Sequence, residues 1–153
     1  MRQTSFIDSL LKWIGYSKGP FTTHTIRLKP GMDLKRELEN TAKLLGLQAA
    51  AIVTTVGSLE KVNLRFADQK QPTPFNGYHE ILSLNGTLSQ SGMHIHLTVA
   101  DKDGQVKGGH LTEGNIIYTT AEIVILEQNH LSFSRVIDPT YGHGELEIQS
   151  RSW

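Results

Sequence analysis

The histidines near the middle of the chain are the residues whose types and spacing best suit chemistry. Residues 93–100 have the alternating pattern of a β-strand, in which successive side chains point to opposite faces. His94 and His96 therefore share one face, and apolar residues occupy the other. Two imidazoles side by side on a strand can supply two nitrogen ligands to one metal ion. This H-x-H pair predicts a metal site on the polar face.

A third histidine, His110, follows a polar turn at 101–104 and a pair of glycines. In a hairpin with a two-residue loop it would face the apolar side, whereas one extra residue, most naturally a β-bulge at Gly108–Gly109, would place it opposite His96. Alternatively, the glycines end the strand and His110 swings back on a loop. Either arrangement brings together three imidazoles, a set typical of a reactive zinc site with an open position. We predict that His94, His96 and His110 bind a divalent metal, with zinc as the expected ion.

The remaining candidates give weaker signals. Glu80 stands at the head of a predicted strand and could be a fourth ligand or a general base, although a plain surface carboxylate is the simpler interpretation. Arg65 and Arg135 lie in predicted strands, where ion pairs or subunit contacts are the default role and anion binding is the alternative. The other four histidines have no comparable grouping: His24, His79, His130 and His143.

Composition limits the possible classes of protein. A chain of 153 residues suits one domain, and its lack of cysteine excludes disulfides and thiolate metal sites. Fifteen basic and 15 acidic residues give a formal net charge of zero, which disfavours a free-standing nucleic-acid binder but not a local basic patch. No apolar stretch is long enough to span a membrane, and Asp8 and Lys12 interrupt the N-terminal apolar run that a signal peptide would need. We expect a cytoplasmic protein without membrane contact.

One internal helix is expected to position these residues together with a sheet. Asp33 is suited to cap the start of the helix, and Gly46 is suited to follow its end. The apolar residues at helical spacing are expected to face the core: Leu34, Leu38, Ala42 and Leu45.

About seven strands are predicted from alternating or continuous apolar residues, at 22–28, 49–56, 59–66, 80–84, 93–100, 116–126 and 131–137, with a weaker one at 145–148. Gly57–Ser58 is expected to separate the second strand from the third, and 67–78 to form a loop. The segment 49–56 is almost entirely apolar and would be buried on both faces. Because the helix comes early and strands follow, the predicted fold is α+β with a mostly antiparallel sheet.

The predicted domain covers residues 21–148. Residues 1–20 are interpreted as an appendage with a short amphipathic helix at 5–15, and 149–153 as a tail. One helix cannot cover both faces of such apolar strands, so a partner subunit is the expected cover.

Several ordered blocks of this region resemble the PPC domain, which occurs alone in prokaryotes and behind AT-hooks in plant nuclear proteins. The blocks are GSLEKVNLRF, EILSLNGTL, HIHLTVADKDGQVKGGHL, TTAEIVIL and FSRVIDPTYGHGEL. The resemblance implies an α+β homotrimer, and in prokaryotic members the histidines that match His94, His96 and His110 resemble a metal site. It also implies association with DNA, but the Arg-Gly-Arg-Pro core of the AT-hook is absent from this sequence.

Two functions are compatible with these residues and with the resemblance. The first is a trimeric binding or regulatory module, associated with DNA or a transcription factor, whose metal is structural or absent. The second is a small metal-dependent enzyme, hydrolase-like, that uses a metal-activated water. In the second, Glu80 is the candidate base and Arg65 or Arg135 would neutralise an anionic substrate. Solvent access distinguishes the two, because a structural site is closed by four protein ligands.

Overall fold

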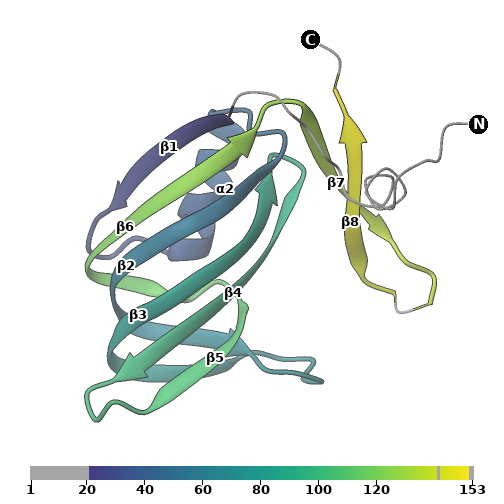
Figure 1. Ribbon diagram of the computed structural model, residues 1–153. Helices are drawn as coiled ribbons and strands as arrows, with labels where there is room; N and C mark the ends of the chain where they lie inside the picture. The colour runs from purple at the N-terminus through teal and green to yellow at the C-terminus, as the bar shows by residue number, and fades with distance from the viewer. Residues whose placement is uncertain (1–20, 141, 152–153) are drawn as a thin grey trace, which may run out of the picture.

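A computed structural model describes residues 21–140 and 142–151, which form one helix and eight strands (Figure 1). The predicted helix at 5–15 lies outside these residues. The elements are β1 (Phe21–Leu28), α2 (Leu34–Leu44), β2 (Ala50–Arg65), β3 (Thr73–Ser89), β4 (Gly92–Asp101), β5 (Val106–Leu111), β6 (Ile116–Gln128), β7 (Leu131–Ile137) and β8 (Gly144–Ser150).

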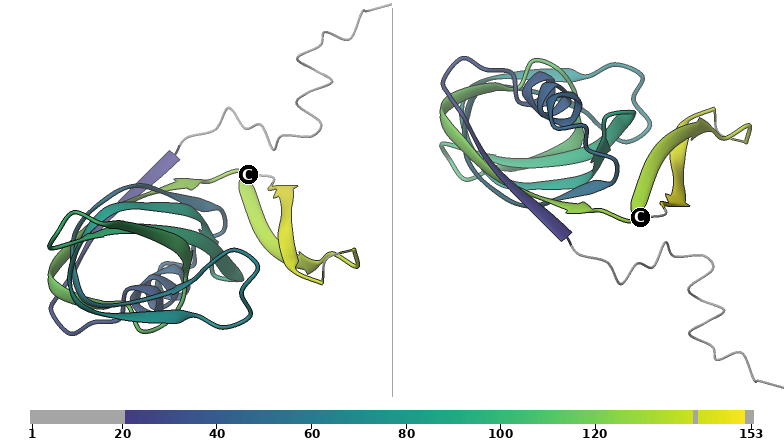
Figure 2. Two further views of the ribbon diagram at one scale, coloured as in Figure 1. Left: turned by 90° about the horizontal axis from the view of Figure 1, so that it is seen from below. Right: turned by 90° about the horizontal axis from the view of Figure 1, so that it is seen from above.

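Six of these strands form one antiparallel sheet in the order β1-β6-β2-β3-β4-β5. The end of β2 also pairs with β5, which closes β2 to β5 into a ring. Seen end-on, the sheet curls around the helix, and the separate β7–β8 hairpin stands beside it (Figure 2). The predicted α+β fold with a mostly antiparallel sheet is confirmed.

The helix α2 begins and ends where its capping residues predict. The Asp33 carboxylate accepts the backbone N–H of Arg36 at 3.1 Å, and Gly46 adopts a left-handed φ of 63°. Leu34, Leu38 and Ala42 are fully buried in the core. The prediction that Leu45 joins them is wrong: it is 44% exposed, because it lies at the C-cap, beyond the last helical turn. Among the described residues, no helix is long and apolar enough to cross a membrane.

The two strands predicted at 49–56 and 59–66 are in fact one continuous strand, β2. Gly57 does not end it but introduces a register shift against β6, with a φ of 152°. The segment is also not buried on both faces, since Val53 and Val56 are 58% and 57% exposed in the single chain.

The loop predicted at 67–78 is too long, because β3 begins at Thr73. Residues 73–76 pair only with β2, and β4 joins β3 from His79 onward. Pro74, which has no N–H to donate, is therefore tolerated at a free edge of the sheet. The strand 131–137 is confirmed, and the weak strand at 145–148 is confirmed as part of a longer β8.

The loop between β5 and β6 is fastened to β2 by a buried amide. Asn115, which is fully buried, accepts the backbone N–H of Asn63 at 3.0 Å. Its Nδ2 donates to the carbonyls of Asn63 at 2.8 Å and Thr112 at 2.7 Å. These bonds hold the end of β5 against β2. They therefore stabilise the closed ring of strands β2 to β5, two of which carry the histidines.

Candidate metal centre

The β4–β5 hairpin places His96 directly opposite His110. Its turn has three residues, 102–104: Asp101 donates its N–H to the carbonyl of Gln105 at 3.0 Å, and Gly104 has a φ of 76°. A three-residue turn with a left-handed glycine is a common hairpin connection. The extra residue that the register needs therefore lies in the turn, and the predicted bulge at Gly108–Gly109 is wrong.

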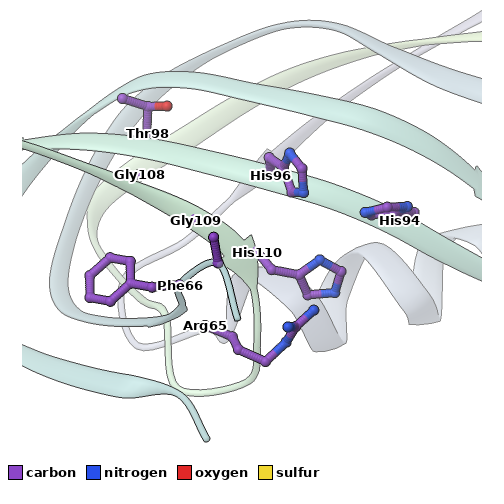
Figure 3. Close-up of a pocket in the computed structure, with 9 residues that line it drawn as sticks. Arg65, Phe66, His94, His96, Thr98, Gly108, Gly109 and His110 are labelled. Carbon is purple, nitrogen blue, oxygen red and sulfur yellow. The ribbon is translucent and has the colours of Figure 1, made fainter. Parts of the chain in front are cut away.

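Three imidazoles meet on the outer face of this hairpin (Figure 3). One ring nitrogen of each of His94, His96 and His110 lies within 4.8 Å of the others, and the ring centroids are 5.0–5.7 Å apart. Within the described part of the chain, no hydrogen bond occupies these nitrogens. Three imidazole donors on two rigid strands match the ligand chemistry of zinc and of other borderline divalent ions.

The paired glycines let the strands approach closely. A Cβ on Gly109 would lie 2.9 Å from the carbonyl oxygen of Arg65, and one on Gly108 would lie 3.2 Å from Thr98 Oγ1. Because Gly109 has no Cβ, β5 packs against β2 with Arg65 opposite His110, and Gly108 likewise lets β5 approach Thr98 of β4. The alternative that the glycines end the strand is also wrong, since β5 runs through both of them, and their role is close packing.

Two adjoining cavities open at the histidines. The first, of about 510 Å³, is lined by all three histidines together with Arg65, Phe66 and Thr98, and by the glycine pair. The second, of about 370 Å³, contains His94, His110 and Arg65 and extends to Arg135, His143 and Glu145. The site therefore faces solvent-accessible space, which a small ligand could occupy.

The structure brings Arg65 and Arg135 to the histidines but not Glu80. Glu80 lies opposite Ala100, whereas His96 lies opposite Asn85. Five residues of strand separate these positions, roughly 16 Å at ~3.3 Å per residue. Glu80 instead lines a different cavity, with Tyr78 and Tyr118.

His143 and Glu145 are the cavity residues that the sequence patterns did not reveal. Both come from the β7–β8 hairpin, which reaches the mouth of the second cavity. No local sequence motif identifies these two residues as cavity residues, because the sequence of β8 indicates only a strand. Arg135, on the neighbouring strand β7, donates from Nη2 to Thr87 Oγ1 at 2.7 Å.

Burial and positive neighbours favour the neutral form of two of these imidazoles, His94 and His110. Burial, then the charges of Arg65, His94 and His96, lower the pKa of His110 to about 4. Burial also lowers the pKa of His94, together with His96 and Arg135, while Glu145 acts in the opposite direction. Since metal ligands must be unprotonated, His94 and His110 are prepared to coordinate at neutral pH.

We expect the metal-free protein to lose stability as the pH falls below about 6.5 toward about 4. In this window the unfolded chain binds a proton at His110 that the folded chain, with its pKa of about 4, does not. Thermal unfolding of chelator-treated protein should therefore give a lower Tm at about pH 5 than at about pH 7. His110→Gln should reduce this difference; an unchanged pH dependence in the variant would contradict the assignment to His110.

The curled sheet, single helix and histidine hairpin define a small α+β domain with a surface cluster of three histidines. The family model of the Plants and Prokaryotes Conserved (PCC) domain matches residues 15–129, so the chain belongs to this family. This is the plant- and prokaryote-conserved (PPC) domain, and the resemblance identified in the sequence is confirmed.

The most informative relatives are one longer curated protein and two solved structures. The bifunctional protein GlmU of Synechococcus sp. (strain JA-2-3B'a(2-13)) is 48% identical over 131 residues, 86% of this chain. The chain spans only 21% of the length of that protein. A hypothetical protein from Salmonella cholerae-suis is 39% identical, with a TM-score of 0.85 over 89% of this chain and 99% of that one. A metal-containing protein from Archaeoglobus fulgidus is 27% identical, with a TM-score of 0.67 over 82% and 93%.

Proposed function

We propose that this domain is a divalent-metal-binding module whose ion is held by His94, His96 and His110. The observation that carries the proposal is the convergence of three imidazole nitrogens within 4.8 Å on one rigid hairpin. Zinc is the proposed ion, because it favours nitrogen ligands and accepts three from the protein. The metal-containing relative from Archaeoglobus fulgidus supports a metal in this family's fold, whichever ion it is.

The open cavity gives this module a ligand-binding role. Three protein ligands leave a position for water or for an external ligand, and the cavity of about 510 Å³ gives access to it. Bound there, the ion would act as a Lewis acid toward the ligand. Arg65 and Arg135 would orient a negatively charged group, and the strands β4 and β5 would keep the imidazoles in place. We propose ligand-dependent regulation as the function of the module.

A hydrolytic reaction is the second candidate, favoured by the same open access. Glu80 cannot serve as its base within one chain, given its distance along β3. Glu145, which lines the cavity beside His94, is the carboxylate better placed to hold a proton there. Turnover of an activated ester or phosphoester by the metal-loaded protein, lost in Glu145→Gln, would favour the enzyme over the regulatory module.

We propose that the module assembles as a homotrimer. Large apolar side chains are exposed on the neighbouring strands β6, β2 and β3, among them Val53, Val56, Tyr78, Leu82 and Tyr118. The rings of Tyr78 and Tyr118 lie with centroids 4.2 Å apart, so these two side chains, from the strands on either side of β2, contact each other. Several exposed large apolar side chains on adjacent strands favour a subunit interface.

Association with DNA is the remaining implication of the family resemblance. The formal net charge is zero and the AT-hook core is absent from the sequence. Direct binding to phosphates draws on an excess of Lys and Arg, so we propose that this association runs through a protein partner such as a transcription factor.

Elemental analysis of untagged protein tests the metal proposal. We expect about one zinc ion per chain in the wild type and none in the triple variant His94→Ala, His96→Ala, His110→Ala. His24→Ala, which removes a histidine outside the cluster, should keep the ion.

Light scattering at micromolar concentration serves as the control for assembly. Wild type and triple variant should both have three times the 17.0 kDa mass of the chain. Particles of monomer mass would overturn the trimer.

The elemental analysis has its own contradicting results. A wild type without metal, or a triple variant that retains the ion, would overturn the metal site.

A further inference from the structure

Two guanidinium groups beside the histidines form no ion pair with a carboxylate of the described residues, although the charge of Glu145 acts on Arg135. Among residues 21–140 and 142–151, none of the ion pairs involves Arg65 or Arg135. Arg65 donates only to the carbonyl of Gln69, at 3.3 Å, and Arg135 only to the hydroxyl of Thr87, at 2.7 Å. Both residues are half-buried and both line the cavity that contains His94 and His110.

The charges at this cavity do not balance. Glu145 is the acidic residue that lines it, and its single negative charge faces two guanidiniums. The histidines add no negative charge, since neutral imidazole is the form that coordinates a metal. A divalent ion would make the cavity more positive still. Half-buried cations without partners are unfavourable unless a counter-ion joins them, so the cavity favours an anion.

The arrangement also limits the kind of anion. Arg presents a planar fork of N–H donors that matches the oxygens of carboxylate and phosphate. A carboxylate has two oxygens, whereas a phosphate group has three terminal oxygens and could contact both arginines and the metal centre together. The adjoining space of about 510 Å³ leaves room for the organic part of a phosphate monoester.

We propose that Arg65 and Arg135 form an oxyanion subsite that binds the phosphate group of a small ligand beside the three-histidine centre. This inference rests on the proposed metal-binding function and specifies its ligand. Arg135 connects the subsite to the β7–β8 hairpin: its Cγ would lie 3.4 Å from a Cβ on Gly92, so its stem packs on the start of β4. The ligand would therefore touch β2, the histidine hairpin and β7.

Calorimetric titration of inorganic phosphate into the zinc-loaded full chain tests the subsite. Arg65→Gln and Arg135→Gln should each weaken phosphate binding by about tenfold or more, with zinc content unchanged. Acetate, with fewer oxygens, should bind the wild type more weakly than phosphate. Arg27→Gln is the matched control, because Arg27 also donates to a threonine hydroxyl, that of Thr120, but lines neither cavity.

The outcomes separate this proposal from the metal site. Equal phosphate affinity in wild type and both arginine variants, or no phosphate binding by zinc-loaded wild type, would overturn the subsite and leave the metal site standing. If the wild type takes up no zinc, the metal site is overturned, and the phosphate titration is then made on the metal-free protein. Phosphate binding that is lost in the two arginine variants would support the subsite. No phosphate binding by the metal-free wild type would overturn the subsite. Should Arg65→Gln misfold, Arg65→Lys keeps the charge without the fork and should lose affinity to a smaller extent.

Discussion

Replacing Gly86 by alanine is expected to destabilise the domain by about 3 kcal/mol or more and to weaken metal binding with it. A Cβ at Gly86 would lie 2.0 Å from the carbonyl oxygen of His94 and 2.7 Å from Cα of Ile95. These are backbone atoms, so the strands β3 and β4 must separate at the point where β4 carries its first histidine. Urea denaturation and zinc titration of the same preparation measure the two effects.

Gly77→Ala is the control that separates crowding from backbone conformation. Gly77 lies in the same strand with a φ of 104°, but a Cβ there meets nothing within 4 Å. It should cost only the conformational penalty of a left-handed residue, about 1–2 kcal/mol, and leave zinc affinity unchanged. Equal losses in the two variants would show that close packing at Gly86 is not the cause.

Asn115→Ala is expected to cost about 3 kcal/mol, because it removes three hydrogen bonds and leaves the backbone N–H of Asn63 in β2 without its partner. The carbonyl of Asn63 keeps its bond from the Thr112 hydroxyl. The end of β5 would also lose one of its attachments to β2, beside the strand pairing of Leu64 with Leu111. The free energy of unfolding from urea titration is the measurement.

Asn129→Ala provides the comparison for this amide. Among the described residues, the side chain of Asn129 bonds only the hydroxyl of Thr22, at an exposed position, and its loss should cost less than about 0.5 kcal/mol. If Asn115→Ala were as mild, the buried amide would not fasten the ring of strands.

The histidine face was predictable because strand alternation is a local property. Met93–Ala100 alternates strictly, so the common face of His94 and His96 followed from sequence alone. The position of His110 depended on the length of one turn, and Gly104 was the residue that could have indicated it. A glycine in the left-handed conformation after two polar residues favours a three-residue turn over a two-residue one.

The rest of the site depends on contacts that no local pattern contains. Arg65 and Arg135 are far apart in the sequence and meet the histidines only through the β2–β5 pairing and the position of the β7–β8 hairpin. The same limit explains Glu80, which stands in a well-predicted strand but at the wrong distance along it.

Errors in the strand boundaries have a related cause. Gly57 and Pro74 are strand breakers by propensity, yet both lie inside strands. Gly57 is accommodated by close contact with β6, where a Cβ would lie 2.1 Å from the carbonyl oxygen of Thr120. Pro74 is accommodated by an unpaired edge. In each case the presence or absence of a neighbouring strand, invisible in the local sequence, decides the outcome.

The three-residue turn of the β4–β5 hairpin has a consequence for how the protein folds. All three histidines lie within Gly92–Leu111, so their meeting requires only the closure of a short loop. Hairpins of this kind form in about 1–10 μs, well before a sheet of long-range contacts is complete. A metal ion present during synthesis would therefore meet its ligands early and favour the correct hairpin register. The metal ion would then raise the folding rate as well as the stability of the folded domain.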